Sequence, residues 1–250
     1  MRSIRQSILC ITMWIAAIGL ASPPQGRAQV DRPRWLDFEF TVLANERLRD
    51  VAYVQLKESA RGKPRPTASD FDVIPMRVIS QGRSDTYHYV GPPPLRFVLT
   101  SGVAETLAVD RVIATVAEPV SAEQSLFVLI ANSEGAYSLL ALDDGRSAHA
   151  EREIRLLNLS NHRISGSLDG QTFELDESRR AYPPESVDRN VHIGIAFERH
   201  NRPVVVFDQS VSVGENERIL LVLLPPIREG ADVRTRVVRD QFRRSPVAGP

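Results

Sequence analysis

The side chains that could perform acid–base or metal chemistry are scattered along this chain. It contains five histidines, of which only His192 and His200 lie near each other in sequence. Phe197 lies between them and a turn-forming Asn-Arg-Pro segment follows, so we expect the two imidazoles at opposite ends of one strand. A metal ion needs convergent ligands and at least a third partner. The histidines therefore predict no metal site.

Acidic and hydroxyl side chains offer a little more. The adjacent pairs Asp143-Asp144 and Asp176-Glu177 resemble the paired carboxylates of acid–base enzymes, but neighbouring acids at strand ends usually form solvated turns. A nucleophile, base and acid can be assembled from Ser210, His192 and Asp208, as from most chains of this length. The chain has no HExxH motif, phosphate-binding glycine loop, GxSxG elbow or EF-hand loop. We therefore expect no catalytic residue and no cofactor.

Two segments contain residues of the kind that contacts ligands. In the first, Tyr-His-Tyr at 87–89, strand alternation places both tyrosines on one face, and the prolines that follow form a stiff, extended stretch. An exposed tyrosine pair would suit a sugar or a peptide, whereas a packed strand followed by a crossover is the simpler interpretation. The second segment, Arg-Arg-Ala-Tyr at 179–182, suits an anionic ligand. The candidate ligand or partner contacts are Tyr87, Tyr89, Arg179, Arg180 and Tyr182.

The N-terminus has the order of a secretory signal peptide: two early arginines, an apolar run that ends at Leu20, and then small residues and prolines. Cleavage after Ala21 and cleavage after Ala28 both satisfy the small-x-small rule, and we take 1–28 as the signal peptide. The apolar run is shorter than the roughly 20 residues that a spanning helix needs. The sequence predicts a chain exported to the periplasm or cell envelope of a bacterium, with no transmembrane segment after cleavage.

Removal of this segment changes both the thiol content and the charge. Cys10 is the only cysteine, so no disulfide, thiolate metal site or cysteine nucleophile can form afterwards. The full chain has 31 basic and 31 acidic residues, and residues 1–28 contain three arginines and no acid, so 28 basic residues face 31 acidic ones after cleavage. This balance argues against a nucleic-acid partner.

The rest of the chain predicts an all-β protein. Short apolar bursts rich in Val, Ile, Leu and Phe alternate with Gly, Pro, Asn and Asp, and no long stretch has helical period. A two-residue Asp169-Gly170 link supplies the positive φ angles of a hairpin turn. We expect strands at 37–43, 51–57, 73–79, 85–90, 95–100, 111–117, 125–130 and 136–142, and at 153–159, 162–168, 171–175, 191–197, 203–208, 218–224 and 233–239.

The two halves also align with each other. The segment 120–130 matches 214–224 at a constant offset of 94 residues, and the strand end at Asp143 matches the one at Asp240 after small insertions. An offset of this size indicates duplicated domains rather than solenoid repeats.

The strand count of each half suits an immunoglobulin-like sandwich, which needs about seven short strands. The predicted organisation is therefore two tandem immunoglobulin-like β-sandwich domains after the signal peptide. We place the domains at 29–150 and 151–242, and a disordered tail at 243–250.

Two short stretches carry a resemblance to a known family. The segment EIRLLNLS at 153–160 and the SLDG hairpin at 167–170 resemble the opening of an uncharacterised bacterial family of exported β-sandwich domains. The segment 89–95 is similar to one in hypothetical exported proteins of similar length. The resemblance implies an envelope location and a sandwich fold, and it implies no catalytic residues.

We expect a non-enzymatic envelope protein that acts through protein contacts or as a structural or assembly module, since folded secreted chains without a convergent polar site are often of this class. The uninterrupted apolar segments 204–207 and 220–224 need cover on both faces. At a sheet edge, either segment would invite strand addition by an envelope protein partner.

Two other classes of function stay open. A carbohydrate-binding module, with a glycan as partner, requires that Tyr87, Tyr89 and Trp35 lie exposed together. A hydrolase with an unfamiliar site requires that His192 or His200 lies beside a carboxylate in a pocket.

Overall fold

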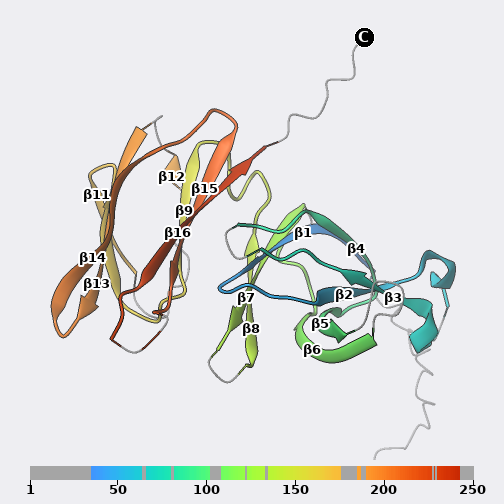
Figure 1. Cartoon of the computed structure of the whole chain (residues 1–250). Coiled ribbons are helices and arrows are strands. Elements are labelled where there is room, and N and C mark those ends of the chain that lie inside the picture. Colours follow the sequence, from blue (N-terminus) through green and yellow to red (C-terminus); the bar gives the residue numbers. More distant parts are fainter. Residues whose placement is uncertain are drawn as a thin grey trace, which may run out of the picture. The chain divides into compact units, whose positions relative to one another are not determined.

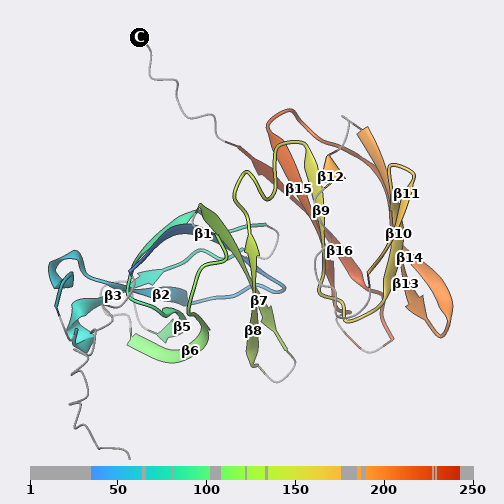
Figure 2. The same ribbon diagram turned by 180° about the vertical axis from the view of Figure 1, so that it is seen from behind.

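A computed structural model describes residues 35–63, 66–79, 82–101, 108–121, 123–132, 135–175, 185–186, 190–226, 228 and 230–242. Within these ranges the chain is all-β, with four four-stranded sheets that form two sandwich-like regions and no α-helix (Figures 1 and 2). The described residues also include two single-turn 3-10 helices, η1 (Glu58–Ala60) and η2 (Ala68–Asp70). No helix in the described part of the chain is long and apolar enough to cross a membrane.

The first region contains the sheets β4-β1-β7-β8 and β3-β2-β5-β6. Its strands are β1 (Leu36–Ala44), β2 (Val51–Leu56), β3 (Phe71–Pro75), β4 (Tyr87–Gly91), β5 (Leu95–Ser101), β6 (Ala108–Val116), β7 (Gln124–Ala131) and β8 (Tyr137–Asp143).

The second region contains the sheets β12-β9-β15-β16 and β11-β10-β13-β14, which Figures 1 and 2 show as two facing layers. Its strands are β9 (Glu153–Asn158), β10 (Ile164–Leu168), β11 (Gln171–Leu175), β12 (Glu185–Ser186), β13 (Asn190–Arg199), β14 (Arg202–Ser212), β15 (Glu217–Leu224) and β16 (Arg234–Gln241).

The two regions repeat one topology. The order β4-β1-β7-β8 in the first region corresponds to β12-β9-β15-β16 in the second, and β3-β2-β5-β6 corresponds to β11-β10-β13-β14. Each region has the same parallel pair, β1 with β7 and β9 with β15, in otherwise antiparallel sheets. Each region also has a β-bulge at the corresponding place. In the first region Ile113 of β6 is the extra residue opposite Phe97 and Val98, and in the second Val206 of β14 is the extra residue opposite Ile195 and Ala196.

Each of the fifteen predicted strands overlaps a strand of the structure, although the one expected at 73–79 lies at Phe71–Pro75, and among the described residues the two-residue β12 was missed. The Asp-Gly hairpin is confirmed, because Asp169 and Gly170 have φ of 48° and 81° and connect the paired residues Leu168 and Gln171. The predicted alignment of the two halves is wrong by one residue at its C-terminal end, where it matched Asp143 with Asp240. Asp144 is bonded opposite Gln124, and Asp240 lies opposite Arg218, so Asp144 rather than Asp143 is the counterpart of Asp240.

The described residues from Trp35 onward belong to one compact unit, which contains three apolar clusters. One fills each sandwich, and the third joins the outer faces of β1, β7 and β8 to those of β9, β15 and β16. In β15, Ile219, Leu221 and Leu223 point into their own sandwich, whereas Leu220, Val222 and Leu224 point into the third cluster. The uninterrupted apolar segment 220–224 is therefore covered on both faces, as expected.

Only one of the two apolar segments lies in an edge strand of the described sheets. β15 lies between β9 and β16, so 220–224 cannot receive a partner strand. β14, which contains 204–207, is an edge strand, and its Val205 is 66% exposed. Two side chains of β16 bond to the backbone of β14, since Thr235 Oγ1 donates to Val206 O at 3.4 Å and Arg239 Nη1 donates to Ser212 O at 2.8 Å. These bonds occupy part of that edge.

Several sequence predictions concern residues outside the described ranges. These are the signal peptide at 1–28, the tail at 243–250, the acidic pair Asp176-Glu177, and the candidate contacts Arg179, Arg180 and Tyr182.

Candidate functional site

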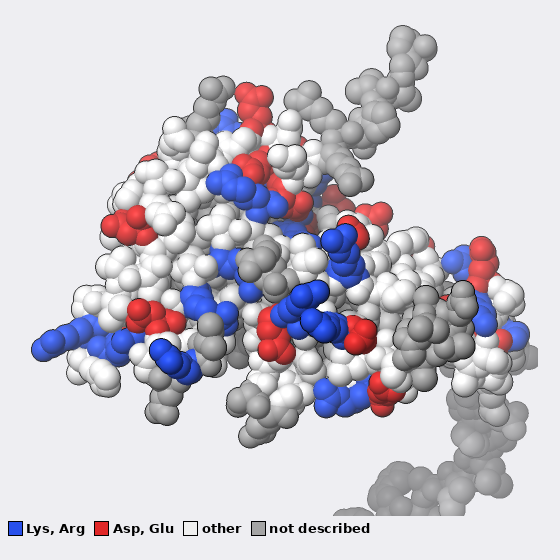
Figure 3. Space-filling view, viewed as in Figure 1, with Lys and Arg blue, Asp and Glu red and all other residues white. Residues whose placement is uncertain are grey.

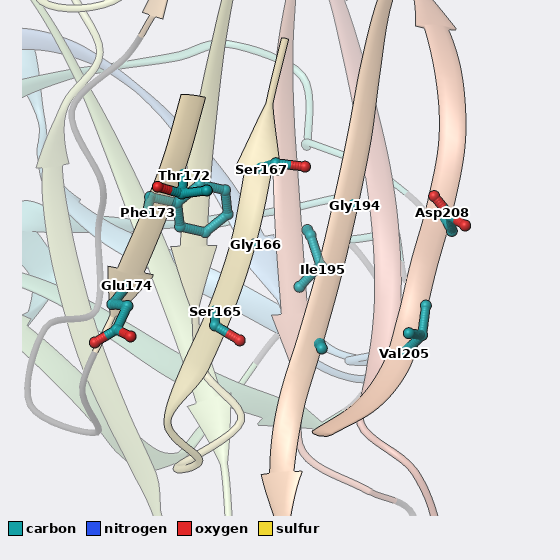
Figure 4. A pocket seen from close by; sticks show the side chains of 11 residues that line it. Ser165, Gly166, Ser167, Thr172, Phe173, Glu174, Gly194, Ile195, Val205 and Asp208 are labelled. Atoms are coloured by element: carbon teal, nitrogen blue, oxygen red, sulfur yellow. The ribbon is translucent and has the colours of Figure 1, made fainter. Parts of the chain in front are cut away.

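The outer face of the sheet β11-β10-β13-β14 carries an open trough of about 710 Å³ (Figure 4). Two rows of directly paired residues form it, each crossing all four strands. The first row is Glu174, Ser165, Ala196 and Val205, and the second is Thr172, Ser167, Gly194 and Asp208. The middle residues of both rows are small and the outer residues are larger, so the sheet is hollowed along β10 and β13 and walled by β11 and β14.

The hollow continues toward the β13–β14 turn. A smaller depression of about 290 Å³ shares Ser165 and Glu174 with the trough and adds Arg163, Glu198 and Pro203. Three strand spacings separate the two walls, or about 14 Å, which exceeds the width of one extended chain. Together the two hollows extend in the strand direction from Ser167 to Arg163.

A β-bulge decides which side chains form the β14 wall. Val205 and Asp208 are three residues apart, and regular strand alternation would place them on opposite faces. The extra residue Val206 shifts the alternation, so Val205 pairs with Ala196 while Asp208 pairs with Gly194, and both line the trough.

The first region provides an internal comparison, because its sheet β3-β2-β5-β6 has the same order and the same bulge. The central positions that correspond to Ser165, Ala196, Ser167 and Gly194 are occupied by Ala52, Val98, Val54 and Arg96. The wall positions that correspond to Glu174, Thr172, Val205 and Asp208 are occupied by Pro75, Val73, Val112 and Thr115. The small floor and the acidic walls are thus properties of these particular residues and not of the fold.

Glycine is required at Gly166, which lies beneath the floor on the core-facing side of β10 and pairs with the buried Phe173 and Ile195. A Cβ at Gly166 would lie 2.3 Å from the carbonyl oxygen of Gly194 and 2.7 Å from the Phe173 ring. Gly194 has more room, because its Cβ would meet Ser167 Oγ at 3.3 Å. A glycine inside a strand often marks close approach of another backbone or a ligand.

One end of the trough holds a histidine–aspartate pair. His192 Nε2 lies 2.9 Å from Asp208 Oδ1, and the two side chains are 59% and 64% exposed. Ser210 lies directly opposite His192 in the β13–β14 register. The structure therefore brings together the serine, histidine and aspartate that the sequence offered. His200 lies at the other end of β13, as predicted.

A second cluster of charged groups lies beneath the surface, where β8 and β16 end. The guanidinium of Arg218, which is 2% exposed, donates from Nη2 to Asp144 Oδ2 at 2.8 Å and from Nε to Asp240 Oδ2 at 2.9 Å. Arg83 Nη1 also bonds to Asp144 Oδ2. Asp144 is fully buried, which corrects the expectation that the Asp143-Asp144 pair forms a solvated turn.

Burial by itself would raise the pKa of Asp144, but His149, Arg83 and Arg218 together outweigh it and lower the pKa to about 2. The pKa of His149 is lowered, first by burial and then by the nearby Arg155, Arg218 and Arg83. His149 Nε2 donates to Glu153 O at 3.3 Å, and its Nδ1 lies 3.9 Å from Asp144 Oδ1. Among the described residues, neither Nδ1 nor Oδ1 has a hydrogen-bond partner.

This cluster is better suited to holding the structure together than to binding. Beside it lies a hollow of about 780 Å³ into which Arg146 and Arg218 project, but both guanidinium groups stack on the Phe242 ring, at 5.0 and 4.7 Å from its centre. Arg218 also bonds to two carboxylates. The cations of this hollow are therefore already engaged.

The tyrosines singled out in the sequence share one face, as predicted, and it is the core face. Tyr89 is 1% exposed and donates its hydroxyl to Pro92 O at 2.6 Å. Tyr87 is partly buried and packs against Phe40 and Tyr53. This arrangement agrees with the packed-strand interpretation and corrects the idea of an exposed tyrosine pair, although Trp35 is 39% exposed.

The surface charge is mixed. On the face shown in Figure 3, basic and acidic side chains are interspersed in small groups.

Comparison with known proteins adds little to this description. No family model matches the chain, and neither does any curated protein. Among solved structures, a leucine-rich repeat protein from Bacteroides thetaiotaomicron is similar at 10% sequence identity, with a TM-score of 0.18. The match covers 82% of this chain and 26% of that protein, so this chain spans about a quarter of its length. A TM-score of this size does not indicate a shared fold.

Proposed function

We propose that this chain is an exported, non-enzymatic binding module of the bacterial cell envelope that holds an extended segment of a partner protein in the trough on β11-β10-β13-β14. The observation that carries the proposal is the floor of small residues between two walls, at positions where the first region has Val98 and Arg96. An extended chain can approach such a floor closely, because the short side chains of Ser165, Ala196 and Gly194 leave little between it and the sheet backbone.

The chemistry of the trough suits a polypeptide. Ser165, Ser167 and Thr172 supply hydroxyl groups that can donate or accept hydrogen bonds, and Val205 supplies an exposed apolar contact at the rim. Recognition by side chains on a sheet face leaves the occupied edge of β14 undisturbed.

We infer that the two regions are tandem duplicates of an immunoglobulin-like sandwich, which is supported by the repeated sheet order, parallel pair and bulge. Each region has eight strands and one parallel pair, so it differs from the seven-stranded antiparallel form. The export and the envelope location rest on the signal-peptide pattern of residues 1–28.

The test is selection of a random peptide library, displayed on phage, against the chain without residues 1–28. We expect enrichment of related peptides that bind wild type and lose at least about tenfold in affinity when Ala196→Val or Ser165→Val fills the floor. Both substitutions introduce a residue that strands favour, so the fold should survive. Circular dichroism and thermal unfolding check that it does.

The first region offers a matched control. Thr115→Val adds the same side chain at an exposed position of β6, the counterpart of β14. The proposal fails if Ala196→Val and Ser165→Val leave the affinity of the selected peptides unchanged. It also fails if Thr115→Val lowers that affinity as much as they do.

Hydrolysis is a second candidate function, favoured by the 2.9 Å approach of His192 to Asp208 with Ser210 opposite. It is the weaker candidate because both side chains of the pair are more than half exposed, and catalytic electrostatics work best where water is excluded. Cleavage of p-nitrophenyl acetate that disappears with both Ser210→Ala and His192→Gln would favour it. Equal background rates in all three proteins would dismiss it.

A further inference from the structure

We infer that the segment held in the trough carries lysine or arginine side chains, which pair with Glu174 on the β11 wall and Asp208 on the β14 wall. The inference rests on the proposed function, and it names the chemistry of the partner. It concerns the acidic walls of the trough, which have no counterpart at the corresponding positions of the first region.

The argument begins with the charges that line the trough. In the described part of the chain its lining contains two charged residues, Glu174 and Asp208, and both are acidic. The adjoining depression adds Glu198 and one base, Arg163. In the first region, Pro75 and Thr115 occupy the positions that correspond to Glu174 and Asp208. A cationic segment therefore meets complementary charge in this trough and not at the corresponding positions of the first region.

Each acidic side chain already has a basic neighbour that can be exchanged. Glu174 Oε2 lies 2.7 Å from Arg163 Nη2, and the two side chains are 66% and 58% exposed. Exposed pairs of this kind contribute little, so an incoming lysine or arginine can replace or join Arg163. Asp208 is paired with His192, whose imidazole offsets the carboxylate charge only when it is protonated.

The placement of the acids also fits an extended segment. Glu174 and Asp208 lie on opposite walls and in neighbouring rows. Along the strands the rows are separated by two residues, or about 7 Å, and across the sheet the walls are about 14 Å apart. A chain lying along β10 and β13 points alternate side chains to the two sides, so basic side chains of one segment reach both acids.

The experiment uses three synthetic peptides of about eight residues, enough to pass both rows at roughly 3.3 Å per residue. They share a Thr-X-Val-Thr-X-Val-Thr-Thr sequence in which X is Lys, Gln or Glu. Fluorescence anisotropy measures their affinities for wild type, for the Glu174→Gln/Asp208→Asn double variant, and for Asp37→Asn. Asp37 is a matched control because it also forms an exposed pair with a histidine, His88, at 2.7 Å.

We expect the Lys peptide to bind wild type at least about tenfold more tightly than the Gln peptide and the Glu peptide to bind most weakly. The double variant should reduce the ratio between Lys and Gln peptides to about one, and Asp37→Asn should leave it unchanged. Raising the salt concentration from about 0.05 M to about 0.5 M should weaken the Lys peptide selectively.

Two results would overturn the inference, and they differ in what they say about the proposed function. If the three peptides bind alike and all are lost with Ala196→Val, the trough is a peptide site without charge preference, and only the inference fails. If no peptide binds and the library selection also returns no sequence sensitive to Ala196→Val, the proposed function fails together with the inference.

Discussion

Asp144 and Asp240 hold equivalent positions at the ends of β8 and β16, and both carboxylates bind the same guanidinium, that of Arg218. The counterpart of Arg218 in the first region is Gln124. The repeated fold thus brings two matching acids together around Arg218, which has no arginine counterpart in the first region, and Arg83 also pairs with both acids. Arg218 also donates to the carbonyl oxygens of Asp144 and His149, at 2.8 and 3.1 Å.

Replacement of Arg218 should be strongly destabilising. Arg218→Met keeps much of the side-chain volume but leaves the buried Asp144 carboxylate with less compensation, and we expect a loss of about 3–5 kcal/mol in the free energy of unfolding. Urea denaturation measures it. Arg239→Met is the control, because its pair with Glu217 is 46% exposed on the arginine side and should cost at most about 1 kcal/mol. Equal losses in the two variants would contradict this account of the cluster.

Acid should destabilise the fold in two steps. The pKa of folded His149 lies below its ordinary 6.5, so the unfolded chain binds more protons and stability falls as the pH drops through about 6.5. The pKa of folded Asp144 is about 2 against an ordinary 3.8, so its contribution is present above 3.8 and disappears as the pH falls toward 2. Urea denaturation over this range measures both steps.

Substitution separates the two acid steps. His149→Gln should remove the upper step and leave the lower one, whereas His88→Gln, at an exposed histidine, should leave both. An upper step that persists in His149→Gln would show that another group causes it.

The turn between β10 and β11 should tolerate little change. Gly170 has a φ of 81°, so Gly170→Ala places a Cβ in the left-handed region and should cost about 1 kcal/mol. Gly214→Ala is the control, because Gly214 has no positive φ and its Cβ would make an ordinary contact with Glu217 Cβ at 3.5 Å. Thermal unfolding compares the two, and an equal effect would contradict the assigned turn.

Tyr89 should behave as a core residue. Burial raises the pKa of Tyr89 to about 12, so its phenol should ionise only in strong alkali, as followed by absorbance during a pH titration. Tyr89→Phe removes the hydrogen bond to Pro92 O and should cost about 1 kcal/mol without changing peptide binding in the trough. If Tyr89→Phe abolished peptide binding but left the stability unchanged, Tyr89 would be a binding residue and not a core residue.

Local patterns predicted most of the secondary structure. Strands such as 125–130 and 218–224 are apolar bursts bounded by turn residues, and the Asp169-Gly170 link encodes its own backbone angles. β12 was missed because a two-residue strand has no periodicity of its own. The burial of Asp144 was missed because its partners Arg83 and Arg218 are distant in sequence.

The trough was not predicted, although the sequence contains every residue that forms it. Period-two alternation assigns Val205 and Asp208 to opposite faces, and only the bulge at Val206 brings them to one wall. Likewise, Ser165, Ser167, Gly194 and Ala196 become a floor only because β10 pairs with β13 in one particular register.

The sequence by itself determined the all-β class, nearly every strand, the Asp-Gly hairpin and the repeat between the two halves, because these depend on short-range periodicity and backbone preference. The tertiary structure alone decided which apolar strand is an edge, which acid is buried, and where small and acidic side chains meet. These outcomes depend on register, bulges and contacts between residues far apart in the chain, which local patterns do not encode.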